Sequence, residues 1–169
     1  MFGSWSVRSG CLIAILSLVG CSQSAWRESS PDGKFKILAP DELVEENPSD
    51  KGPTDRIWGI TERHGRYMVY TSEVGQSTSP EVIQQALERI ARDLIEKTEA
   101  KLRTLTPIKL NDQYLGVEIE ADHPTQNASI RARIYYSPGR IYRIIVSGKN
   151  AWFTLAEVNK YFDSFEILN

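Results

Sequence analysis

Three carboxylates and one imidazole lie close together in the segment GVEIEADHP, residues 116–124. Glu118, Glu120 and Asp122 alternate, so on a β-strand their side chains point to one face, with His123 beside them. Carboxylate oxygens and imidazole nitrogens bind divalent cations. The spacing is therefore compatible with a cation site, or with a row of charges that meets its partners on a neighbouring strand.

A basic segment that follows favours the second interpretation. If a turn is centred near residues 125–126, the flanking segments pair as an antiparallel hairpin. Glu118 then lies opposite Arg133. In the same register, Glu120 lies opposite Arg131. We therefore expect cross-strand ion pairs on a solvated face and no metal site.

The two histidines do not indicate a catalytic centre. His64 lies in the turn-like sequence RHGR, and His123 precedes Pro124. Nucleophile elbows, zinc-protease helices and phosphate-binding loops have recognisable spacings, and the sequence contains none of them. We therefore expect the histidines to be surface residues, and we expect neither a cofactor nor enzymatic activity.

The start of the chain predicts an exported protein. Residues 11–20 (CLIAILSLVG) are uncharged, and Arg8 is the one charged side chain before them. A helix that spans a bilayer needs about 20 apolar residues, so this shorter run predicts a signal peptide over residues 1–20. The apolar run stops at Cys21, where the polar chain begins.

The residues at this boundary, LVGC (residues 18–21), resemble the lipobox of bacterial lipoproteins. The resemblance implies that the Cys21 thiol, a good nucleophile, carries lipid and holds the chain on the extracytoplasmic side of a bacterial membrane, facing the periplasm or a lumen. The alternative is an ordinary signal peptide that happens to contain a cysteine. Since Cys11 is lost with the signal peptide, no thiol is left for a disulfide, catalysis or a metal. Residues 21–31 are expected to be the lipidated cysteine and a flexible tether.

Composition limits the classes of partner. The 169 residues are 41% hydrophobic and 25% charged, which is typical of a globular protein, and residues 32–169 are expected to form one domain. The net charge is −2, and no block of like charges forms an interaction tail. This composition gives no indication of a nucleic-acid partner.

One long helix is strongly predicted. Ser79 is a good N-cap, Pro80 suits the first helical position, and Glu81 suits the positive end of the helix. Apolar residues then recur with a period of 3.6 at Ile83, Leu87, Ile90, Leu94 and Ile95. We expect the helix to end near Leu105, before Pro107.

The rest of the domain is predicted to be rich in β-strands, with a second helix near its end. A turn at Pro138 and Gly139 predicts one hairpin, and Asn150 can cap a helix over residues 151–162. The expected strands are residues 34–39, 57–60, 66–72, 108–110, 114–121, 130–136, 141–147 and the C-terminal 162–168. This order of about seven strands and two main helices does not alternate, so it predicts an α+β domain with a largely antiparallel sheet.

Three segments and the long helix resemble the PsbP-like superfamily, whose namesake is an extrinsic protein of photosystem II. The segments are SPDGKFKILAP (residues 30–40), SPGRIYRIIVSG (residues 137–148) and FDSFEIL (residues 162–168). The resemblance implies an αβα sandwich, in which a central antiparallel sheet carries helices on both faces. The sequence lacks the aromatic run of the photosystem proteins after its first strand and is more similar to the lipoprotein branch.

These features predict a membrane-anchored, non-enzymatic module that binds or helps to assemble a protein partner in the envelope or in a photosynthetic membrane. Phe153 and Tyr161 fall off the apolar stripe of the second helix and are candidate contacts for that partner. The alternative is a lipoprotein that binds a small ligand or a cation, or an enzyme with an unrecognised site.

Overall fold

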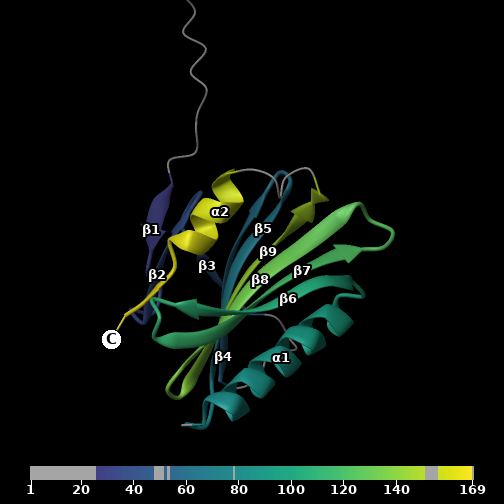
Figure 1. The fold of residues 1–169 in the computed structure, drawn as a ribbon. Helices are drawn as coiled ribbons and strands as arrows, with labels where there is room; N and C mark the ends of the chain where they lie inside the picture. Colours follow the sequence, from purple (N-terminus) through teal and green to yellow (C-terminus); the bar gives the residue numbers. More distant parts are fainter. Residues whose placement is uncertain (1–25, 48–51, 53, 78, 151–155, 169) are drawn as a thin grey trace, which may run out of the picture.

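The computed structural model describes residues 26–47, 52, 54–77, 79–150 and 156–168. These residues form ten strands and two helices (Figure 1). The strands are β1 (Arg27–Ser29), β2 (Phe35–Ala39), β3 (Val44–Glu46), β4 (Asp55–Glu62), β5 (Gly65–Glu73), β6 (Lys101–Leu110), β7 (Tyr114–His123), β8 (Ala128–Ser137), β9 (Arg140–Lys149) and β10 (Glu166–Ile167), and the helices are α1 (Pro80–Lys97) and α2 (Ala156–Asp163).

Seven strands form one large antiparallel sheet in the order β3-β4-β5-β9-β8-β7-β6. The expected hairpin between β8 and β9 is confirmed, because Ser137 pairs with Arg140 across a two-residue loop. Gly139 has a φ of 82°, which suits the third position of a type II turn. Val44–Glu46 lies outside the strands expected from the sequence and adds the short edge strand β3.

Three short strands form a second, antiparallel sheet in the order β1-β2-β10. Strand β1 lies within the tether expected over residues 21–31, so that expectation is corrected for the part from Trp26 onward. The Trp26 ring packs edge-on against Tyr67, with the centroids 5.9 Å apart. The Lys160 ammonium lies 4.7 Å from the Trp26 ring centroid. The packing of this half-buried ring and the three residue pairs between β1 and β2 therefore fix this segment to the domain.

Helix α1 begins where the sequence predicts and ends earlier. The hydroxyl of Ser79 accepts a hydrogen bond from the Val82 backbone N–H, and Pro80 opens the helix. The expectation of a helix to residue 105 is wrong, because α1 ends at Lys97 and Glu99 takes a left-handed φ of 54°. The residues that follow form strand β6, at the edge of the large sheet.

Helix α2 is described from Ala156 to Asp163, and the residues expected to begin it, 151–155, lie outside the described residues. Its buried side chains are Val158, Tyr161 and Phe162. Asn150, the expected cap, accepts a hydrogen bond from the Ser129 hydroxyl at 2.7 Å. In the part of the chain that the structure describes, no helix is long and apolar enough to cross a membrane.

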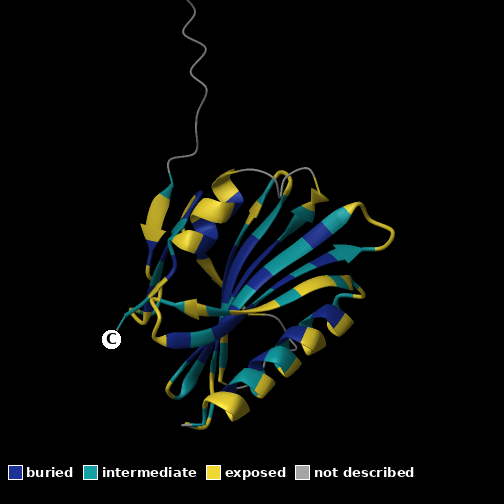
Figure 2. Cartoon of the chain, in the orientation of Figure 1, coloured by how far each residue is buried: buried dark blue, intermediate teal, exposed yellow. Residues whose placement is uncertain are grey.

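The two helices cover opposite faces of the large sheet, as the αβα sandwich requires, and both turn their buried sides toward it (Figure 2). On one face, α1 packs on β7, β8 and β6 through Ile83, Leu87, Ala91 and Ile95. On the other face, α2 and the small sheet cover an aromatic core that includes Phe35, Trp58, Tyr67, Tyr142, Phe162 and Phe165. The predicted α+β fold class is confirmed.

Candidate functional site

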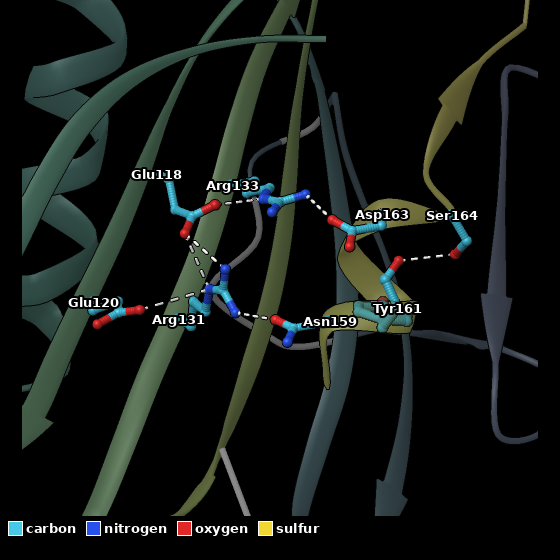
Figure 3. A network of polar contacts seen from close by, with 8 residues as sticks. All are labelled: Glu118, Glu120, Arg131, Arg133, Asn159, Tyr161, Asp163 and Ser164. Carbon is cyan, nitrogen blue, oxygen red and sulfur yellow. Dashed lines mark hydrogen bonds and ion pairs between the residues drawn. The ribbon is translucent and has the colours of Figure 1, made fainter. Parts of the chain in front are cut away.

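A charged cluster lies on the large sheet beside α2 (Figure 3). The predicted register is confirmed, since Glu118 pairs with Arg133 and Glu120 with Arg131. Glu118 nevertheless accepts hydrogen bonds from both arginines. Arg131 donates to Glu118 Oε1 through Nε at 3.1 Å and Nη2 at 2.8 Å, and Arg133 Nε donates to Oε2 at 2.5 Å. Arg131 Nε lies 3.8 Å from Glu120 Oε1.

Helix α2 covers the cluster and completes it. Asn159 Oδ1 accepts from Arg131 Nη1 at 2.6 Å, and Asp163 Oδ1 accepts from Arg133 Nη1 at 2.8 Å. Both guanidinium groups also lie over the Phe162 ring, 5.1 and 5.3 Å from its centroid. The expectation of a solvated face is therefore corrected, because the side chains of Glu118, Arg131 and Arg133 are each no more than 20% exposed.

The arginines set the protonation of the cluster. Burial acts to raise the pKa of Glu118, but hydrogen bonds from Arg133 and Arg131 outweigh it and lower that pKa. Burial likewise acts to lower the pKa of Arg133, but hydrogen bonds to Glu118 and Asp163 raise it. Each charged form is thus stabilised by its partner, and the cluster binds helix α2 to the sheet.

The other two residues of the acidic segment have separate partners. Asp122 Oδ1 accepts from the Ser129 hydroxyl at 2.6 Å, and its Oδ2 lies 3.5 Å from Arg103 Nε. The His123 Nδ1 accepts from the Thr125 backbone N–H at 3.3 Å. No group of three or more potential metal-binding side chains occurs within the described ranges. The arrangement seen for these carboxylates is ion pairing and hydrogen bonding.

A polar cleft of about 260 Å³ adjoins the cluster. It is lined by Arg103, Glu120, Ala121, Asp122, Ser129, Ile130, Arg131 and Asn150. Its two arginines and two carboxylates balance in charge. An alternation of donors and acceptors can bind a polar peptide or protein surface without a strong preference for one sign of charge.

An apolar groove of about 560 Å³ lies on the opposite face, beside α1. Because α1 packs mainly on β6, β7 and β8, the side chains of β5 and β9 form much of the floor of this groove. Its apolar lining includes Met68, Tyr70, Leu94, Ile130 and Ile145. Arg66 lies at the groove and forms an ion pair with Glu46.

Of the remaining candidate residues, the structure describes Tyr161 and does not describe Phe153 or Cys21. Tyr161 is 0% exposed and packs 4.8 Å from the Tyr67 ring, so its proposal as a partner contact is corrected. Its spacing of three from Val158 places it on the buried face of α2, and burial raises its pKa well above the ordinary value. Phe153 and Cys21 lie outside the described residues.

Sequence reasoning missed the contribution of α2 to the charged cluster. Asn159 and Asp163 are four residues apart, so they share one face of the helix. That spacing was visible in the sequence, and it could have indicated a polar stripe aimed at a charged strand. The contact between α2 and β8 itself depends on how the chain folds back over the sheet.

No protein-family model matches the chain, and no curated protein matches its sequence. The solution structure of cyanobacterial PsbP (CyanoP) from Synechocystis sp. PCC 6803 matches with a TM-score of 0.64 at 12% identity, over 90% of this chain and 98% of that chain. A crystal structure from Bacteroides thetaiotaomicron VPI-5482 matches with a TM-score of 0.47 at 11% identity, over 83% of this chain and 47% of that chain. The likeness to CyanoP shows a PsbP-like fold.

Proposed function

We propose that this PsbP-fold chain is a bacterial lipoprotein, anchored through Cys21 on the extracytoplasmic side of a membrane, which binds a protein partner without catalysing a reaction. The partner is a protein of the envelope or of a photosynthetic membrane. The LVGC boundary at residues 18–21 supports the anchor, and the similarity to CyanoP supports the fold on which binding depends.

The observation that carries this proposal is the position of Trp26. Its ring is packed on the domain, so residues 22–25 alone separate it from Cys21. A lipidated chain of this design stays close to the bilayer. Such confinement raises the effective concentration for a membrane-bound partner and gives no comparable advantage with a diffusing metabolite.

We place the partner at the polar cleft next to α2. Three of its charged side chains are well exposed, with fractions of 57% for Arg103, 37% for Glu120 and 40% for Asp122. Glu118 pairs with Arg131 and Arg133, and these contacts fix the surface next to the cleft before a partner arrives. Complementary charges on an ordered surface favour specificity and a fast association rate.

Photo-crosslinking in living cells tests this placement. A photoreactive amino acid replaces Arg103 in the cleft or, as the control, the exposed Arg92 on α1. We expect one defined protein adduct from position 103, none from position 92, and loss of the adduct when Cys21→Ala is added. Equal adducts from both positions, or no adduct from position 103, would overturn the proposal.

The apolar groove beside α1 supports a second candidate function, the binding of a small apolar ligand. Its volume of about 560 Å³ falls in the range of known ligand pockets, which are mostly apolar with a few polar groups. Native mass spectrometry of the chain purified from its host tests this candidate. A retained ligand that is lost in Ile145→Lys would favour it, and a ligand-free chain would exclude it.

A further inference from the structure

We infer that the end of the domain formed by the β4–β5 turn, the last residues of β9 and the face of α2 next to Trp26 is a contact surface for the phospholipid headgroups of the bilayer. The inference deepens the proposed function and rests on the lipidation of Cys21. The first step is the length of chain that leaves the domain. Trp26 is five positions after Cys21 in the sequence, so a fully extended chain between them spans at most about 18 Å.

The second step is where that chain leaves the domain. Trp26 packs against Tyr67, which lies two residues after Gly65, the first residue of β5. The backbone N–H of Lys149, at the end of β9, donates to the carbonyl of His64 in the β4–β5 turn at 3.0 Å. The start of β1, the start of β5, the end of β9 and α2 all lie at the top of Figure 1. One end of the molecule therefore carries both the anchor and this surface.

The third step is the chemistry of that end. Its exposed cationic side chains include Arg63, Lys149 and Lys160, and the half-buried Trp26 ring lies beneath the Lys160 ammonium. Aromatic rings and long cationic side chains suit the headgroup region, where an apolar body meets a polar surface. Carboxylates also lie at this end, among them Glu62 and Glu157. The lipid anchor therefore supplies the affinity, and the surface sets the orientation.

The opposite end of the sheet is too far away to make the same contact. Strand β9 has ten residues, which places the β8–β9 turn about 30 Å from Lys149. Gln76 is exposed and lies next to Gly139 in that turn, since a Cβ on Gly139 would meet its side chain at 3.8 Å. In this orientation, one end of the large sheet faces the bilayer and the β8–β9 turn at the other end faces the aqueous space.

Depth-dependent quenching tests the orientation. The full-length lipidated chain is labelled with a fluorophore at Thr61→Cys, near the β4–β5 turn, or at the control Gln76→Cys, and is reconstituted into phosphatidylcholine–phosphatidylglycerol vesicles with nitroxide-labelled headgroups. Both native residues are exposed, and under the proposed processing no other free thiol competes for the label. We expect loss of most of the fluorescence at position 61 and no loss at position 76.

The outcomes separate the inference from the function on which it rests. A chain that does not float with the vesicles would overturn the lipidation of Cys21. A chain that floats but is quenched equally at both positions, or more strongly at position 76, would overturn the orientation alone. A long Gly-Ser insertion after Ala25 should reduce the quenching at position 61, because the anchor then no longer holds this end near the headgroups. Unchanged quenching would contradict the tether argument.

Discussion

At the scale of single residues, Glu118 is the central group of the charged cluster. It is one carboxylate between two guanidinium groups, and all three side chains are largely withdrawn from water. A charge in such surroundings is stable because of its partners, so the removal of one member leaves the others uncompensated. The loss of unfolding free energy on substitution should therefore depend on the hydrogen bonds that a residue makes, and not only on which residue lies opposite it in the sheet.

Glu118→Gln is expected to lower the free energy of unfolding by about 2 kcal/mol, less than a fully buried pair would lose because these side chains keep some solvent access. Glu120→Gln is the matched control. Glu120 is 37% exposed and lies 3.8 Å from Arg131 Nε, so its loss should cost less than about 0.5 kcal/mol. Urea unfolding at neutral pH measures both, and equal losses would contradict the central position of Glu118.

The lowered pKa of Glu118 also predicts how stability depends on pH. Its ordinary value is about 4.3, and the arginines place the folded-state pKa below this. The stabilisation is therefore fully present above the ordinary pKa and is lost as the pH falls through the folded-state pKa. The stability difference between the wild type and Glu118→Gln should shrink as the pH falls below about 4.3. Urea midpoints of both chains across this range check the prediction, and a constant difference would refute it.

Gly116 provides a second prediction for a single residue. A Cβ at this position would lie 2.5 Å from Tyr135 Cδ1 and 2.7 Å from the Ile134 carbonyl oxygen, closer than packed atoms approach. Gly116→Ala should therefore cost about 1–3 kcal/mol of unfolding free energy through overpacking. Gly75→Ala, which meets no atom within 4 Å, should change little. Thermal unfolding of the two variants distinguishes them, and similar melting temperatures would show that Tyr135 moves aside.

At the scale of elements, the sequence predicted helices and strands correctly where residues close together in the chain determine the structure. Ser79, Pro80 and Glu81 mark the start of α1, and alternating apolar residues mark the strands of the large sheet. The end of α1 was missed because Leu102 and Leu105 continue a helical spacing, and because Glu99 is not the glycine that usually marks such a stop. Strand β1 was missed because three polar residues become a strand only by pairing with β2.

The N-cap of α1 gives a prediction at this scale. Ser79→Ala removes the acceptor for the Val82 backbone N–H and should lower the unfolding free energy by about 1 kcal/mol. Ser79→Asp keeps an acceptor oxygen at the positive end of the helix and should restore most of that loss. Chemical denaturation of the three chains provides the measurement. A Ser79→Asp chain no more stable than Ser79→Ala would show that the cap contributes nothing.

At the scale of the whole molecule, the anchor and the fold should be separable. Cys21→Ala is expected to release the chain from the membrane fraction, because the proposed function attaches the chain through lipid on Cys21. The melting temperature of the released chain should match that of the detergent-solubilised wild type, since Cys21 precedes Trp26, the first residue described as packed on the domain. Detergent phase separation followed by thermal unfolding checks both parts. Membrane retention of the variant would disprove the lipid anchor.

The pairing of β5 with β9 has a consequence for the order in which the chain folds. On each side of this pair, β3 to β5 and β6 to β9, each strand pairs with the strand that follows it in the sequence. The pair itself joins Gly65 to Gly148 and Glu73 to Arg140, across sequence separations of 83 (148 − 65) and 67 (140 − 73) residues. Since a contact of that separation closes a long loop and slows folding, the two halves should form early and join late. We therefore expect the pairing of β5 with β9 to be the slowest step in the assembly of a sheet whose other pairings are local.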